Sequence, residues 1–290
     1  MAPYGLFLVA GLALGAGYAL SGVGLVVLYR ATGVLNLAYG AIGALGAMVA
    51  WQLGQWGWPE AVGWMAALFV AVILSVGYGR FVAPRLAWRE PVVKAVATLG
   101  FALIVLGLAN WLWVESPRRL ALATDGLSAE FLGLRITGTR ALALLVAVLA
   151  TIGIAVFLQR TRAGLLMRSL ANDRDLSSML GVPVVEVETI AWLISGVLCG
   201  FSGLMLGDLV RLNPTVLTFL VIPAIAAAIV GRVASLPATL AGGLLIGVVE
   251  SMAALVPAIA PFRSAAPFIV AALLLLWFQR HRRLIFAADA

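Results

Sequence analysis

The sequence predicts an all-α polytopic integral membrane protein with eight to nine transmembrane helices. The 290-residue chain is 63% hydrophobic and only 11% charged, with a mean hydropathy of +1.11. A soluble domain carries about 25% charged residues, so this composition excludes one. Apolar runs also recur along the whole length, separated by shorter polar intervals. We therefore expect residues 1–290 to form a single transmembrane domain.

The expected spans follow from runs that approach the roughly 20 apolar residues needed to cross a bilayer. The first run lacks a basic leader and a cleavage pattern, so we expect it to remain as a span. The count stays at eight to nine for two reasons. The glycine-rich interval after Arg30 is compatible with a broken or re-entrant segment, and the seventh and eighth runs meet at a tight turn. The runs cover residues 5–29, 33–56, 61–78, 96–113, 142–158, 189–206, 216–230, 237–256 and 264–278.

Orientation follows from the basic residues. If the basic tail 279–290 lies inside, 13 of the 19 basic residues fall on the inner side. This asymmetry fits the positive-inside rule and predicts a cytoplasmic C-terminus. It also explains the net charge of +7 without a nucleic-acid partner, because no basic cluster is interleaved with aromatic residues on a soluble face.

Two long polar loops interrupt the runs. Residues 115–140 form the outer loop, in which Leu132, Leu134 and Ile136 alternate with Gly133 and Arg135. This alternation predicts a small hairpin. Residues 160–188 form the inner loop, which carries charges of both signs.

The inner loop has a helical pattern in its first half. Leu166 and Leu170 lie four residues apart, on one face of a helix beginning after Thr161, and Arg168 lies on another face.

The second half of the inner loop predicts another short helix. Asp173 can cap a helix that carries Leu176 and Leu180, and Gly181 followed by Pro183 ends it. The apolar faces of the two helices leave two interpretations open. They form a docking surface for another protein, or they lie on the membrane surface or against the chain's own spans.

No catalytic or metal-binding arrangement is present in the sequence, so we do not expect an enzyme. The only histidine, His281, lies in the basic tail, and the only cysteine, Cys199, lies in an apolar run. Neither has the partners that a nucleophile or a metal site requires. The glycines of GLALGAGYALSG lie inside a span without a preceding strand or a lysine, so they predict close helix packing rather than a phosphate loop.

A few polar residues within the spans are candidates for a functional role. Glu250 lies in an apolar run, where a carboxylate needs a partner or a water-filled cavity. It is either a pathway or switch residue or a structural carboxylate. A helix that breaks at Asn36, close to Tyr39, would expose backbone groups, and such breaks are tolerated where they line a cavity.

Three segments together resemble the permease subunits of the branched-chain amino acid type of bacterial ABC importer, and the resemblance covers nearly the whole chain. An N-x-A-x-G element follows a Y-A-L span in GLALGAGYALSGVGLVVLYRATGVLNLAYGAIGALGA. The inner loop, TRAGLLMRSLANDRDLSSMLGV, is similar to the family's cytoplasmic loop. The third segment, SLPATLAGGLLIGVVES, is similar to a signature that includes the acidic residue at Glu250.

The sequence also departs from the family pattern. Tyr39 stands where many members have histidine, and Arg232, Ala234 and Ala238 stand where glycines are usual. These departures leave the family resemblance in place and bear on the substrate class, and we expect the tight turn after residue 230 to be built differently.

The resemblance implies a permease domain in the bacterial inner membrane. Its implied partners are two ABC ATPase subunits, a second permease that is homologous or identical, a periplasmic solute-binding protein and membrane lipid. ATP would be used by the ATPase subunits, with no cofactor in this chain. A small amino acid or related metabolite would cross by ATP-driven alternating access, with residues 115–140 in the periplasm and residues 160–188 as the cytoplasmic coupling loop.

The resemblance also assigns roles to residues. Those implied for the translocation pathway are Asn36, Tyr39 and Glu250. Those implied for coupling to the ATPase are Arg162, Gly164, Leu166, Arg168, Leu170, Asp173, Leu176, Leu180 and Gly181. The alternative is an ATP-independent secondary transporter or channel, which would need ion-coupling carboxylates within the membrane, where only Glu250 is available.

Overall fold

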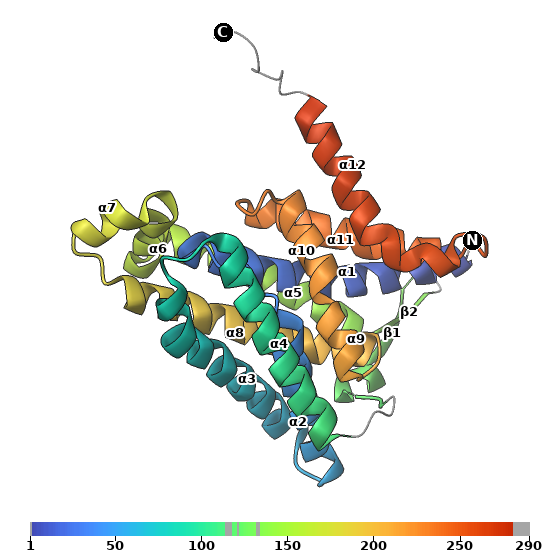
Figure 1. Cartoon of the computed structure of the whole chain (residues 1–290). Helices are drawn as coiled ribbons and strands as arrows, with labels where there is room; N and C mark the ends of the chain where they lie inside the picture. The colour runs from blue at the N-terminus through green and yellow to red at the C-terminus, as the bar shows by residue number, and fades with distance from the viewer. Residues whose placement is uncertain (1, 114–117, 121, 132–133, 281–290) are drawn as a thin grey trace.

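The chain folds into a bundle of helices with one small hairpin, as the computed structural model in Figure 1 shows. The structure describes residues 2–113, 118–120, 122–131 and 134–280. The predicted basic tail beyond residue 280, including His281, lies outside the described residues. The all-α membrane fold predicted from composition is confirmed.

Among the described residues, six helical segments are long and apolar enough to cross a membrane. Helix α3 continues without interruption through a π-helical turn, η1 (Tyr78–Val82), and a 3₁₀ turn, η2 (Ala83–Leu86). The six helices are α1 (Ala2–Thr32), α3 (Glu60–Gly77), α4 (Pro91–Leu112), α5 (Gly138–Arg160), α8 (Val184–Leu209) and α11 (Leu236–Ala253).

Three further apolar segments coincide with predicted spans but are shorter. They are α2 (Tyr39–Gln55), the kinked pair α9 (Pro214–Phe219) and α10 (Val221–Val230), and α12 (Ala266–Arg280). Helix α2 has 17 residues, which is about 26 Å of helix against a hydrocarbon core of about 30 Å. The helix of the span predicted for residues 33–56 therefore begins six residues after the predicted start, because residues 33–38 are irregular. Helix α12 projects away from the rest of the bundle (Figure 1).

The polar inner loop folds as its sequence pattern predicts. Helix α6 (Arg162–Asn172) begins after Thr161, whose Oγ1 accepts the N–H of Gly164 at 3.0 Å. Helix α7 (Arg174–Met179) is capped by Asp173, whose Oδ1 accepts the N–H of Leu176 at 2.9 Å. Gly181 follows with a left-handed φ of 83°. One boundary differs from the prediction, because α8 already begins at Val184 and includes the last residues assigned to this loop.

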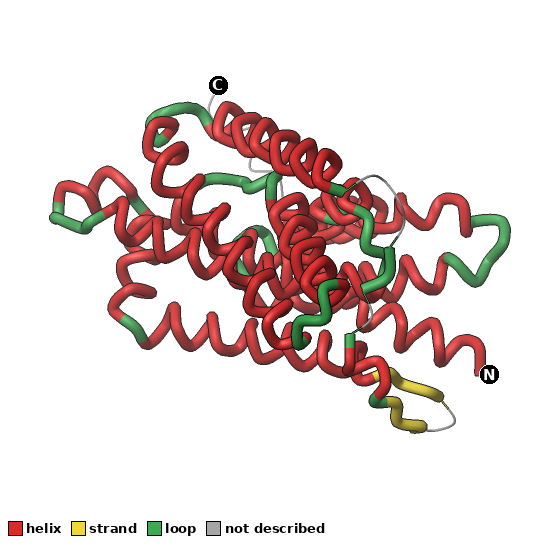
Figure 2. Tube along the Cα trace, turned by 90° about the horizontal axis from the view of Figure 1, so that it is seen from below, coloured by secondary structure: helices red, strands yellow, loops and turns green. Residues whose placement is uncertain are grey.

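The two ends of the bundle carry different elements. Strands β1 (Ser128–Phe131) and β2 (Leu134–Thr137) pair antiparallel, with Ser128 opposite Thr137. This hairpin confirms the predicted one, although Leu132 and Gly133 lie outside the described residues. Both views place the hairpin at the end of the bundle where the chain begins, with α7 at the opposite end (Figures 1 and 2). The turns η3 (Ala123–Gly126) and η4 (Ala260–Ala265) complete the fold.

The turn between α10 and α11 holds two non-glycine residues in a left-handed backbone conformation. Arg232 and Val233 have φ angles of 55° and 52°, in the left-handed region that favours glycine. Arg30 at the end of α1 donates a hydrogen bond from Nη1 to the carbonyl of Ala234 at 3.1 Å. The turn is therefore tied to α1.

Helices α1 and α11 pack through glycines. Gly11 and Gly15 of α1 contact the backbone of α11 at Gly243 and Gly247. A Cβ atom on Gly247 would lie 2.3 Å from the backbone nitrogen of Gly15. The close packing predicted for the first glycine-rich run is confirmed, because any side chain at these positions would push the two helices apart.

We predict that Gly247→Ala lowers the free energy of unfolding by about 1–3 kcal/mol, the usual effect of overpacking a tight interface. The matched control is Gly153→Ala on α5, because a Cβ atom there meets nothing within 4 Å. Thermal unfolding can be followed with a thiol-reactive dye, because the only cysteine of the chain, Cys199, is buried. Equal melting temperatures for the two variants would contradict the glycine interface.

Candidate translocation pathway and docking surface

The chain breaks its helical course between α1 and α2, at residues 33–38. Gly33 has a φ of 66°, which reverses the chain after α1. Asn36 is buried, and its Oδ1 accepts the N–H of Ala38 at 3.0 Å. The break predicted at Asn36 is thus present, and Asn36 itself satisfies one of the amides that the break exposes.

Helix α4 supplies the other partner of this segment. The hydroxyl of Thr98 accepts the N–H of Leu37 at 3.0 Å, and it lies 3.0 Å from the carbonyl of Leu35 and 2.7 Å from that of Ala95. A hydroxyl has one proton and two lone pairs, so it can serve as acceptor and donor at once. Side chains therefore bond the N–H groups of Leu37 and Ala38 and the carbonyl of Leu35 within an otherwise apolar bundle.

Tyr39 begins α2 beside this break. Its carbonyl accepts a hydrogen bond from Sγ of Cys199 at 2.9 Å. Its hydroxyl is buried near Ser202 but makes no hydrogen bond within the described part of the chain. A small cavity between Ser21, Tyr39 and Ser202 offers about 10 Å³ to the centre of a water molecule, which is about the space that one water needs.

Glu250 lies apart from Asn36 and Tyr39. It is half-buried on α11, and its Oε2 accepts a hydrogen bond from the hydroxyl of Tyr18 on α1 at 3.0 Å. It does not line the cavity beside Tyr39. The structure therefore brings together two of the three predicted pathway residues and places the third in the contact between α1 and α11.

Sequence reasoning missed three residues of this region, Thr98, Cys199 and Ser202. Each is a single small polar residue within an apolar run, which gives no periodic signal. Only the fold shows that they face the break and Tyr39.

The predicted docking residues divide into two groups. Gly164 and Leu170 are buried against the bundle, and Leu166 is half-buried and packs against the core. A Cβ atom on Gly164 would lie 2.5 Å from the carbonyl oxygen of Phe157 in α5. Of the two interpretations left open by the sequence, packing against the chain's own spans therefore describes Leu166 and Leu170, because that face of α6 covers the core.

Helix α7 presents the exposed apolar surface. Leu176, Met179 and Leu180 are 54%, 85% and 74% exposed. They lie three and four residues apart, on one face of the helix. Arg162 is exposed and Arg168 is half-buried on α6, at the same end of the bundle. We call Leu176, Met179 and Leu180 the α7 face.

The fold defines a polytopic α-helical membrane protein with a broken helix inside the bundle and an exposed short helix, α7, at one end. No group of three or more potential metal ligands occurs among the described residues. The family model for the permease component of branched-chain amino acid transport systems matches residues 7–278. The chain belongs to this family of ABC transporter permeases.

Three relatives show the range of the family. The high-affinity branched-chain amino acid transport system permease protein LivH of Salmonella typhimurium is 26% identical over 259 residues, 83% of each chain. Its counterpart BraD of Pseudomonas aeruginosa is 25% identical over 264 residues, 85% of each chain. The fructose import permease protein FrcC of Rhizobium meliloti is 26% identical over 230 residues, 75% of this chain and 62% of the relative.

We predict that Thr98→Val destabilises the protein by about 1–3 kcal/mol, because valine keeps the shape but leaves the N–H of Leu37 and the carbonyl of Leu35 without a partner. Thr151→Val is the matched control, since the buried hydroxyl of Thr151 bonds only to Ala147 in its own helix. Thermal unfolding of both variants measures the difference. A Thr98→Val variant as stable as the control would show that the break does not depend on this hydroxyl.

Proposed function

We propose that this permease imports a small amino acid or related metabolite by ATP-driven alternating access, with α7 as its docking site for an ABC ATPase subunit. The observation that carries the proposal is the exposed α7 face. Nothing in the described part of the bundle covers it, and large apolar side chains grouped on one face are typical of a protein interface. The family membership favours this function over an ATP-independent transporter or channel.

The basic residues support a cytoplasmic position for the α7 end. Arg30, Lys94 and Arg232 lie there together with the arginines of α6. By the positive-inside rule, this end faces the cytoplasm and the hairpin faces the periplasm. The same rule, applied to the basic residues of the sequence, supports a cytoplasmic C-terminus. A periplasmic binding protein would then deliver solute at the hairpin end, and two ATPase subunits would act at the other.

The buried residues of α6 give the docking site a mechanical role. Gly164 packs against the backbone of α5, and Leu170 is part of the core at the end of α1. A displacement of α7 by the ATPase is therefore carried into α5 and α1 through close contacts. Gly164 and Leu170 transmit the motion in this proposal, whereas the α7 face makes the contact. ATP is consumed by the partner subunits, and the chain itself carries no cofactor.

The solute would pass the break between α1 and α2. Asn36 and Tyr39 lie at the point where the helix is interrupted, and discontinuous helices are typical of solute sites in transporters. A second permease, identical or homologous, completes the pathway on the other side. The relatives include permeases named for branched-chain amino acids and for fructose, so the substrate class rests on the amino acid relatives.

The direct test is uptake by proteoliposomes that contain the permease, its ATPase subunits and its binding protein. Uptake of an amino acid that requires ATP and both partners would support the proposal. Uptake by the permease alone, without ATP, would overturn it in favour of a secondary transporter.

We predict that Leu176→Asp and Met179→Asp weaken ATPase binding about 30-fold, as expected for interface anchors that contribute about 2 kcal/mol. Ser178→Asp is the matched control, because it adds the same charge to the opposite face of α7. Co-purification and ATP-dependent uptake give the readout, and melting temperature reports folding. If all three variants couple normally, α7 is not the docking site.

We further propose that Glu250 is a structural tie between α1 and α11 rather than a pathway residue. Tyr18→Phe removes the hydrogen bond and should lower stability by about 1–3 kcal/mol. Glu250→Gln keeps an acceptor for Tyr18 and should leave ATP-dependent uptake within about twofold, since a retained acceptor keeps most of the bond. Loss of uptake in Glu250→Gln at unchanged melting temperature would instead make the carboxylate part of the transport cycle.

A further inference from the structure

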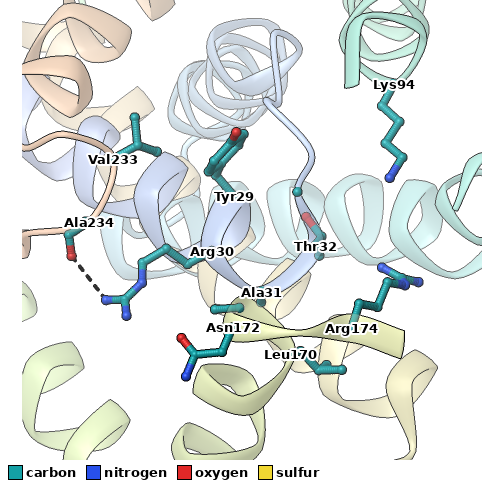
Figure 3. Close-up of a pocket in the computed structure, with 12 residues that line it drawn as sticks. Tyr29, Arg30, Ala31, Thr32, Lys94, Leu170, Asn172, Arg174, Val233 and Ala234 are labelled. Atoms are coloured by element: carbon teal, nitrogen blue, oxygen red, sulfur yellow. Dashed lines mark hydrogen bonds between the residues drawn. The ribbon is translucent and has the colours of Figure 1, made fainter. Parts of the chain in front are cut away.

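A polar cavity lies at the α7 end, and Gly33, the first residue of the break after α1, is part of its lining. The cavity has a volume of about 540 Å³. Figure 3 shows that its walls come from separate segments, namely the end of α1, the start of α4, the junction of α6 and α7, and the α10–α11 turn.

The cavity is lined by positive charge. Arg30, Lys94 and Arg174 contribute to its wall, and no acidic residue of the described chain does. The carboxylate of Glu188 is buried and forms an ion pair with Arg174. The lining therefore carries three cations, of which Arg174 is paired with a carboxylate.

Two of these cations face one another. Figure 3 shows Lys94 and Arg174 reaching toward each other from α4 and α7, across the opening between them. Arg174 is held by Glu188 and Arg30 by the carbonyl of Ala234. The side chain of Lys94 makes no hydrogen bond or ion pair within the described residues, and the residue is half-buried. Like charges arranged in this way repel, and an anion between them would remove the repulsion.

The surroundings of Lys94 indicate the source of such an anion. Val92, Val93 and Val96 on α4 are exposed beside it, and Trp88 is exposed just before the helix begins. An apolar helix surface that leads into a basic cavity at the end of a span suits a phospholipid, with its acyl chains along the helix and its headgroup among the cations.

We propose that this cavity binds a phosphate-bearing anion, with the headgroup of an anionic phospholipid as its ligand. Such a ligand would join α4, α7 and α1 at the end where α6 and α7 lie. The position of the docking helices would then depend on the lipid composition of the membrane. The inference does not depend on which solute the permease carries.

Lys94 provides a selective test, because it is the only lysine in the chain. Full-length permease is placed in nanodiscs of phosphatidylcholine, of phosphatidylcholine with phosphatidylglycerol, or of phosphatidylcholine with added inorganic phosphate. An uncharged amine-reactive ester then modifies Lys94, and mass spectrometry gives the rate. The Arg89→Lys variant supplies an exposed reference amine at the same end, so the ratio of the two rates removes effects of surface potential.

We expect phosphatidylglycerol to slow the modification of Lys94 about fivefold relative to the reference amine, the effect of one basic contact with an anionic headgroup. Protection by phosphatidylglycerol alone identifies a lipid site. Protection by inorganic phosphate as well identifies an anion site that also accepts the free ion. Equal rates under all three conditions would overturn the proposal. The cations of the cavity would then be assigned to contact with a protein partner.

A second measurement uses lipid retention. Lys94→Gln should bind phosphatidylglycerol about fivefold more weakly through detergent purification, whereas Arg89→Gln should bind it as the unaltered protein does. Lys94→Gln breaks no hydrogen bond within the described residues, so it should fold, and its melting temperature in phosphatidylcholine verifies this. Equal retention by both variants contradicts the proposal.

Discussion

The hydrocarbon core offers no water to backbone amides and carbonyls, and the architecture of this permease depends on that constraint. Continuous helices satisfy it in the six long segments. Residues 33–38 satisfy it in another way, because Asn36 and the hydroxyl of Thr98 replace the missing helical bonds. The break depends on α4, because Thr98 of that helix lies within hydrogen-bond distance of Leu37. The location of the proposed pathway is therefore set by hydrogen bonds between α4 and the segment after α1.

Close packing and exposed surface have complementary roles in the rest of the molecule. Glycines hold α1 against α11, and Tyr18 and Glu250 add a hydrogen bond to the same contact. At the other end of α1, Arg30 donates a hydrogen bond to the carbonyl of Ala234, in the turn that precedes α11. Helix α6 packs on that framework, whereas α7 turns its leucines and Met179 outward. In the docking proposal, the ATPase therefore contacts the exposed α7, and the packed α6 carries the displacement into the bundle.

Much of this arrangement could be predicted from the sequence, because local signals act over a few residues. Thr161, Asp173 and Gly181 mark the ends of α6 and α7 correctly, and Asn36 marks the break. The spacing of Leu166 and Leu170 shows that they share a face, but it does not show what covers that face. The fold decides this, since α6 packs on α5 and α1.

The remaining misses have a similar cause. Glu186 and Glu188 suggest a loop by their charge, yet Glu188 is buried within α8 because Arg174 neutralises it from fourteen residues away. Thr98 and Cys199 meet partners that are distant in the chain. Pairings of this kind leave no trace in periodicity, so the sequence indicates the presence of a break but not the residues that support it.

The unusual bonding of residues 33–38 gives these amides a second use. The N–H groups of Leu37 and Ala38 are held by single side-chain oxygens rather than by a helical ladder. Amide protons held in this way exchange with solvent once water reaches them and the side chain moves. Their hydrogen–deuterium exchange thus reports when water reaches the interior of the bundle. It allows the opening of the proposed pathway to be timed without an attached probe and without knowledge of the solute.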